Sequence, residues 1–170
     1  MGRVALTDIY AFPDPVIGFN FNLIVPNPPG GGSGRALNVK CKSTSLPGSS
    51  IEPVEVALHG HVIKRAGRRT FPRSLPFSLL ETTDFSSRLT LRKWMNTARR
   101  AKDQGGTDSS IYAVDATIEV LNDAGDILYS VVCVKAWPEE LSDSDLSGEG
   151  SNPLEFSGQL SYDVVQEPGD

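Results

Sequence analysis

The chain of 170 residues lacks the features that mark membrane-spanning, secreted or disordered proteins. No run approaches the roughly 20 apolar residues that a transmembrane helix needs. The N-terminal stretch MGRVALTDIYAFPDPVIGF is broken by Asp8, Pro13, Asp14 and Pro15, so it has no uninterrupted signal-peptide core. A hydrophobic share of 39% and a charged share of 22% are those of an ordinary globular protein. We therefore expect one domain spanning residues 1–170, made in the cytoplasm and without a membrane partner.

Catalytic and metal-binding motifs are also scarce. Cys41 and Cys133 lie far apart in strand-like runs, which favours two buried, reduced thiols; an intramolecular disulfide or a contact between subunits is the alternative. His59 and His61 are two apart on one apparent strand and so point to the same side, but the paired spacings of a zinc site are absent. No nucleophile signature surrounds either cysteine. We expect no enzyme activity, no catalytic residue, no metal and no cofactor.

Basic residues are almost missing from the last third of the chain. Residues 1–114 contain 15 Lys and Arg against 8 Asp and Glu, whereas residues 115–170 contain 1 against 13. The net charges of the two parts are therefore +7 and −12. If the parts form opposed faces, a self-associating protein would favour head-to-tail contacts. If they interleave in the fold, the charges mix over its surface.

Most of the chain alternates apolar and polar residues with the period of two that marks strands. The alternating runs are FNFNLIV (19–25), VEVAL (54–58), IYAVDATIEVL (111–121), ILYSVVCVKAW (127–137) and LEFSGQLSYDV (154–164). The tight reversal NDAGD (122–126) joins two of them into a hairpin. Each strand thus has one apolar and one polar face, which is typical of an antiparallel β-sandwich or barrel.

One segment has a helical period instead. DFSSRLTLRKWMNTARRAKDQGG (84–106) starts with three candidate capping residues and stops at two glycines. Its apolar stripe is made by Leu91, Trp94, Met95 and Ala98, and basic residues fill the rest. A basic helix can bind nucleic acid or membrane, but this one has no aromatic residues among the charges. We expect a helix over 84–104 that packs on the sheet and keeps its basic side in solvent.

Two loops stand out by composition. VPNPPGGGSGR (25–35) lacks the Gly-Lys-Ser/Thr of a phosphate loop and leads into the strand-like run RALNVK, so we expect a flexible hairpin tip. EELSDSDLSGEGSNP (139–153) is long and acidic, and loops of this length are usually functional or mobile. Between strand-like runs, CKSTSLPGSS (41–50) contains a Leu-Pro-Gly break that predicts a corner.

Five segments in a set order carry a family resemblance. They are CKSTSLPG, VALHGHVIKRAGRRTF, LRKWMN, VVCVKAWPEEL and LEFSGQLSYDVV, and the matching region spans residues 19–165. Together they resemble the tail tube proteins of contractile-tailed bacteriophages, which are similar in fold to the hemolysin-coregulated tube protein of type VI secretion. The corner motif matches Cys41 to Pro47, and a turn motif matches Ala66, Gly67, Arg69, Thr70 and Phe71. Arg68 departs from it, since the family turn carries Asp there.

The resemblance implies a mainly β protein, an antiparallel sandwich or barrel with one flanking helix, that assembles into hexameric rings sharing a lumen barrel. Stacked rings would form a tail tube that conducts genomic DNA during ejection without sequence-specific binding. The partners would be further copies of the chain, a contractile tail sheath protein, baseplate and tail terminator proteins, and the tape-measure protein in the lumen. The protein would reside in the virion tail after assembly in the host cytoplasm.

Three groups of surface residues follow as candidates for this role. Glu55, Asp115 and Glu119 lie on polar strand faces, and we expect them to line the channel, because an acidic wall repels phosphates. We expect the basic helix face to meet the sheath through Arg88, Arg92, Arg99 and Arg100. For stacking of rings we expect basic residues to face the acidic loop of the next ring: Lys64, Arg65, Arg68, Arg69 and Arg73 against Asp143, Asp145 and Glu149.

Other functions fit the same residues. The inner tube of a type VI secretion system or contractile bacteriocin would look nearly the same in sequence. A monomeric β-sandwich binding module, or a hydrolase that uses Cys41, His59 and His61, is a more distant alternative. A sizing column separates these classes, because a stable monomer would favour the binding module.

Overall fold

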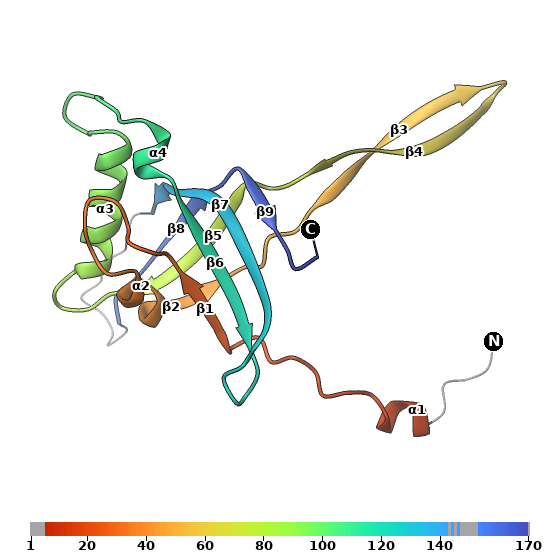
Figure 1. The fold of residues 1–170 in the computed structure, drawn as a ribbon, viewed down its shortest axis with the longest axis horizontal. Helices are drawn as coiled ribbons and strands as arrows, with labels where there is room; N and C mark the ends of the chain where they lie inside the picture. The colour runs from red at the N-terminus through yellow and green to blue at the C-terminus, as the bar shows by residue number, and fades with distance from the viewer. Residues whose placement is uncertain (1–5, 143, 145, 147–152, 170) are drawn as a thin grey trace.

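The structure is a computed structural model that describes residues 6–142, 144, 146 and 153–169. The predicted stacking residues Asp143, Asp145 and Glu149 lie outside the described residues. The elements occur in the order α1 (Leu6–Tyr10), β1 (Phe21–Ile24), α2 (Gly34–Lys40), β2 (Cys41–Thr44), β3 (Ser50–Leu58), β4 (His61–Thr70), β5 (Ser74–Leu80), α3 (Ser86–Ala98), α4 (Ser109–Tyr112), β6 (Val114–Leu121), β7 (Ile127–Leu141), β8 (Glu155–Ser161) and β9 (Val164–Gln166) (Figure 1). None of the helices among these residues is long and apolar enough to cross a membrane. The fold is mainly β, as predicted.

Strand β7 organises the main sheet. The strand order is β1-β6-β7-β8-β5-β2, with β9 also paired to β7, and the pairings are antiparallel. The first part of β7 pairs with β6 and β9, and its last residues pair with β8. The change occurs at Lys135, which has a φ of 55° and lies at a register shift opposite Asp115. Asp115 accepts a hydrogen bond from the Lys135 backbone N–H at 2.9 Å and so stabilises this bulge.

The two parts of the sheet share one hydrophobic core. The core side chains of β6 and β7 include Ala116, Ile118 and Val131, each at most 1% exposed. The other part of the sheet contributes residues at every second position of β5 and β8: Leu75, Phe77, Leu79, Phe156 and Leu160. This alternation is the predicted antiparallel pattern, and the NDAGD reversal joins β6 to β7 as expected.

Helix α3 covers the core with a stripe that differs from the predicted one. Leu91 and Trp94 are buried as expected, and the Trp94 indole N–H donates to the Tyr112 carbonyl at 2.6 Å. The other buried residues of the helix are polar, Ser87 and Thr90, whereas the predicted Met95 and Ala98 are only half-buried. Thr90 is buried because the glycine-rich loop lies on it: a Cβ at Gly32 would come 2.4 Å from the Thr90 side chain.

Three predicted boundaries are wrong. Helix α3 ends at Ala98 rather than at 104, because residues 99 and 106 form a β-bridge and the Thr107 N–H donates to the Ala98 carbonyl. Segment 25–35 is not a hairpin tip, since Ser33 caps α2 and the run RALNVK is helical rather than extended. Strand β7 includes Glu139 and Glu140, so the acidic loop begins after Leu141. Besides α3, therefore, a second helix joins the core through Leu37.

Candidate functional site

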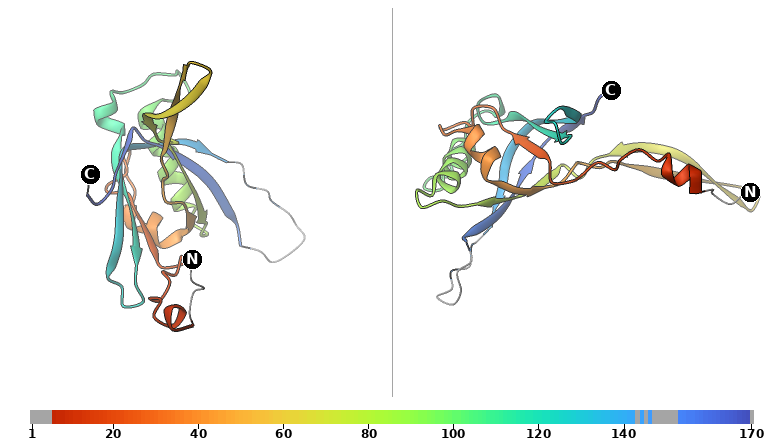
Figure 2. Two further views of the ribbon diagram at one scale, coloured as in Figure 1. Left: turned by 90° about the vertical axis from the view of Figure 1, so that its right-hand side faces the viewer. Right: turned by 90° about the horizontal axis from the view of Figure 1, so that it is seen from below.

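Strands β3 and β4 form a two-stranded sheet that projects from the body of the molecule (Figures 1 and 2). They pair with each other from Ser50 opposite Thr70 to Leu58 opposite His61, and the remaining residues of the tip are His59 and Gly60. Both tip residues have positive φ values, 47° and 82°. The family turn motif at residues 66–71 is therefore not a turn, because it lies in β4 and the link that follows. We call residues 50–70 the hairpin.

The hairpin has one apolar and one polar face, and both are open to solvent. Val54, Val56, Leu58 and Ile63 share a face, which we call the apolar hairpin face, with exposed fractions of 50, 36, 55 and 39%. Arg65 and His61 are on the same face, opposite Val54 and Leu58. On the other face, Glu55 and Lys64 form an ion pair with a distance of 3.1 Å between the carboxylate and Nζ. The prediction that each strand has a buried face is therefore wrong for β3 and β4 within a single chain. Exposed apolar side chains at alternate positions indicate an interaction surface.

Basic residues are concentrated on β4. Of the five stacking candidates, Lys64, Arg65, Arg68 and Arg69 are in this strand, and Arg73 is in the link to β5. The guanidinium of Arg69 lies 5.1 Å from the Phe71 ring centroid, and its Nε donates to Ser49 Oγ at 3.1 Å. Four of the five predicted stacking residues thus lie on the projecting hairpin, with Lys64 and Arg65 on opposite faces of it.

A second projection is formed by residues 6–17, which we call the N-terminal arm. Its large apolar side chains are exposed by 44 to 83%: Leu6, Ile9, Tyr10, Phe12, Val16 and Ile17. At the base of the arm, Val16 and Ile17 border a groove with Leu121 and Leu128 at the β6–β7 turn. The arm and the hairpin leave the body on the same side, away from α3, and they are separated along the vertical direction of Figure 1 (Figures 1 and 2). Apolar residues are dense before residue 20 in the sequence, but no pattern among them predicted a projecting arm.

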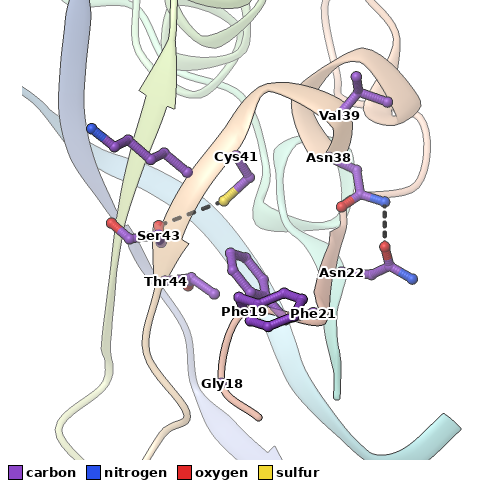
Figure 3. Close-up of a pocket in the computed structure, with 10 residues that line it drawn as sticks. Gly18, Phe19, Phe21, Asn22, Asn38, Val39, Cys41, Ser43 and Thr44 are labelled. Atoms are coloured by element: carbon purple, nitrogen blue, oxygen red, sulfur yellow. Dashed lines mark hydrogen bonds between the residues drawn. The ribbon is translucent and has the colours of Figure 1, made fainter. Parts of the chain in front are cut away.

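A groove of ≈ 600 Å³ lies between the two ends of the main sheet (Figure 3). Strands β1 and β2 border it, and each pairs with a neighbour on one side only. Phe19 and Val39 are 71 and 77% exposed at its rim, and Asn38 donates to Asn22 Oδ1 at 3.1 Å. The groove is lined by aromatic rings, amides and hydroxyls, which suit contact with another polypeptide. Among the described residues, no group of three or more His, Cys, Asp or Glu is placed to hold a metal ion.

The structure separates the three predicted channel residues. Asp115 and Glu119 share the polar face of β6, whereas Glu55 is on the hairpin. Asp115 accepts the hydrogen bond from the Lys135 backbone at the bulge of β7, and Glu119 accepts a hydrogen bond from Asn22 Nδ2 at 3.2 Å on neighbouring β1. A single wall made by all three would need surfaces from both sheets.

The predicted sheath-facing arginines have different environments. Arg92 is exposed on α3, but Arg99 and Arg100 follow the helix, and Arg100 pairs with Asp103 at 3.0 Å. The Arg88 guanidinium lies 6.0 Å from the Phe156 ring centroid, and the residue is half-buried. Of the four, Arg92 alone is an exposed residue within the helix.

A buried ion pair holds the start of α3. The helix begins after Phe85, which is in the left-handed region and provides no side-chain cap. Glu81, with 1% of its side chain exposed, accepts hydrogen bonds from the backbone N–H groups of Thr82 and Arg88, both at 3.0 Å. Lys40, at the end of α2, has its Nζ 3.8 Å from Glu81 and 3.7 Å from Asp84. Glu81 and Lys40 therefore join the two helices, while the predicted cap Asp84 accepts the backbone N–H of Ser86 at 3.3 Å.

The side chains of the hydrolase alternative are not assembled into a site. His59 is at the hairpin tip and His61 begins β4, so the expectation that both project from one strand is wrong. Cys41 is in β2 on the body, far from the tip (Figure 1). Both cysteines are free thiols. Burial raises the pKa of Cys133 to about 11, and burial, partly offset by a hydrogen bond to the Ser43 carbonyl, raises the pKa of Cys41 to about 11. Raised values oppose thiolate formation and hence nucleophilic reactivity.

Comparison with known proteins identifies relatives of the whole fold. A family model described as phage tail tube protein matches residues 19–165. The anti-feeding prophage cap, a tube-terminating cap, is similar with a TM-score of 0.69 and 18% identity over 92% of each chain. A sheath–tube complex of an extracellular contractile injection system contains a chain with a TM-score of 0.66 and 18% identity, over 97% of this chain and 99% of that one. The sheath/tube terminator of the same kind of system has a TM-score of 0.67 and 17% identity, over 92% of this chain and 99% of that one. The search of curated proteins found no match.

Proposed function

The chain belongs to the phage tail tube protein family, and from this premise we propose that it forms hexameric rings that stack into the inner tube of a contractile tail. The tube lies inside a sheath, encloses the tape-measure protein during assembly, and conducts DNA during ejection. The role is structural rather than catalytic, and the location is the virion tail after assembly in the host cytoplasm. A sheath partner is supported by the similar fold of a tube chain in a sheath–tube complex. Baseplate and terminator proteins would bind the two ends of the tube.

The apolar hairpin face is the observation that carries this proposal. The exposed parts of its four side chains amount to roughly two whole side chains, at about 1.5–3 kcal/mol each when buried. Covering the face would contribute about 3–5 kcal/mol for each hairpin. A projecting strand pair with free edges and an apolar face is costly in a monomer and is suited to a neighbouring copy.

Electron microscopy of the purified protein tests the proposal. We expect rings or tubes for the natural sequence, and at least a tenfold higher concentration for assembly when Val54, Val56 and Ile63 are replaced by serine. The matched control is Val62→Ser, which removes a 60% exposed valine from the polar face of the same hairpin. A natural protein that remains monomeric on a sizing column at high concentration would overturn the proposal.

Charge is proposed to act in the channel and between rings. Asp115, Glu119 and Glu55 would give the channel wall an acidic surface that repels phosphates. The basic hairpin cluster would face acidic residues of the next ring, in a head-to-tail contact that a ring repeats around its axis. Exposed ion pairs contribute only about 0–1 kcal/mol each, but the contributions add over the copies of a ring. High salt screens them and should therefore shorten the tubes. Unchanged tube length from 0.05 to 1 M salt would contradict this part.

The inner tube of a headless injection device is the second candidate. It is favoured by the similar folds of chains from the anti-feeding prophage and an extracellular contractile injection system. Neighbouring genes distinguish the two roles, because a phage tail requires capsid and terminase genes beside it. Absence of both beside a sheath gene would favour the headless device.

A further inference from the structure

We propose that the N-terminal arm of one copy packs along the apolar hairpin face of the adjacent copy. This proposal rests on the proposed tube, and it assigns a partner to the two projections that the core leaves uncovered. The occupant is a second copy of this chain, bound through its residues 6–17.

The placement of the two projections favours a contact between copies. The arm and the hairpin extend from the body in the same direction, one below the other in Figure 1, and they overlap in the view from below in Figure 2. A copy displaced along the vertical direction of Figure 1 therefore brings its hairpin beside the arm of the first. When the displacement is combined with a rotation about an axis, the repeated contact is heterologous and can close into a ring.

The lengths of the two segments match. Strand β3 has 9 residues, which span roughly 30 Å in an extended conformation. The five residues of α1 and the seven residues that follow it in the arm also span roughly 30 Å. An arm can therefore follow a hairpin from its base to its tip.

The chemistry of the two segments is complementary. Both expose large apolar side chains at several positions, Ile9, Tyr10 and Phe12 on the arm and Val54 and Val56 on the hairpin. Residues 6–17 carry two acidic and no basic residues, whereas residues 50–70 carry four basic and two acidic ones. Apolar burial would hold the contact, and the opposite charges would favour arm-to-hairpin over arm-to-arm pairing.

Cysteine cross-linking tests the contact directly. The variant Phe12→Cys/Val56→Cys should form a ladder of disulfide-linked oligomers on a non-reducing gel under mild oxidation, and dithiothreitol should return it to monomer. Phe12→Cys/Val62→Cys is the matched control, because Val62 is on the opposite face of the hairpin; its ladder should be at least tenfold weaker. The natural sequence should form no ladder, since its two cysteines are in β2 and β7.

A substitution cycle gives a second measurement. Ile9→Ser/Phe12→Ser should raise the concentration needed for assembly at least tenfold. Combining it with Val54→Ser/Val56→Ser should add little, because both pairs remove the same contact. Circular dichroism checks that these exposed changes leave the fold intact.

The outcomes separate this proposal from the proposed function. Tubes without a ladder, a disulfide within one chain, or additive effects of the arm and hairpin variants would overturn the arm contact and leave the tube standing. A natural protein without any assembly would overturn both.

Discussion

Replacing Glu81 with alanine should lower the free energy of unfolding by about 3–5 kcal/mol. The carboxylate is buried, and it accepts the backbone N–H groups of Thr82 and Arg88 while facing the ammonium of Lys40. Alanine would leave two partly buried donors without their acceptor, at up to about 1–3 kcal/mol each, and would remove the buried counter-charge of Lys40. Natural domains are stable by only about 5–15 kcal/mol, so the loss would be a large part of the total.

Burial, rather than proximity to Lys40, decides this magnitude. Asp84 is as close to Lys40 Nζ as Glu81 is, 3.7 against 3.8 Å, but 65% of its side chain is exposed against 1%. Water and salt screen an exposed pair. We therefore expect Asp84→Asn to destabilise the protein much less than Glu81→Ala. Glu81→Gln retains an acceptor and should fall between them, at about 1–2 kcal/mol.

Urea unfolding in a monomeric background measures these differences. The triple serine variant of the hairpin serves as background, because assembly would otherwise add to the apparent stability. Fluorescence of Trp94, which is completely buried on α3, and of Trp137 in β7 reports loss of the core, while circular dichroism follows the sheet. A loss below 1 kcal/mol for Glu81→Ala, or equal losses for Glu81 and Asp84, would refute the reasoning.

Three further predictions concern other parts of the molecule. Iodoacetamide should modify Cys41 and Cys133 slowly at pH 8 in the folded protein and rapidly in urea, because the pKa values of both thiols rise from 9.0 to about 11 on folding. For the same reason the thiols of the unfolded chain ionise at lower pH, so the stability present below pH 9 should fall as the pH rises towards 11. Gly32→Ala should cost on the order of 1–3 kcal/mol in urea unfolding, since φ is +133° and the new Cβ meets Thr90, and Thr90→Ala should recover part of the loss. Arg92→Glu should weaken binding to the purified sheath protein in a pull-down and leave tubes intact by electron microscopy, whereas loss of tubes would place α3 at a subunit interface.

The repeating patterns predicted the parts of the fold that depend on local chemistry. Alternation over 111–121 correctly assigned Ala116 and Ile118 to the core, because side chains of a strand point alternately to opposite faces. Its first two residues were wrong, since Ile111 and Tyr112 belong to α4 and β6 begins at Val114. The Asn-Asp-Ala-Gly-Asp reversal was also correct, since Gly125 adopts the positive φ, 88°, that such a turn needs. The stripe of α3 was identified through Leu91 and Trp94.

Short and polar segments were misread because their conformation depends on tertiary contacts. The run RALNVK is too short to show a helical period, and Leu37 is its one buried residue. Ser87 and Thr90 are polar, so no hydrophobic pattern marks them as buried, and Thr90 is covered by the glycine-rich loop, which is distant in sequence. The importance of Glu81 and Lys40 was equally invisible, because 41 positions separate two charges that meet only after α2 and α3 pack together.

By itself the sequence determined which faces of its strands are apolar and which family the chain resembles, because periodicity and the order of motifs are properties of the chain alone. Only the tertiary structure decided where these faces lie. Val54 and Val56 alternate like core residues, yet the fold carries them outward on a projecting hairpin, on the same side as the apolar N-terminal arm. The physical reason is that an alternating pattern predicts that one face of a strand is buried but does not predict what covers it. The covering segment is determined by long-range packing and, for this hairpin, by the proposed neighbouring copy.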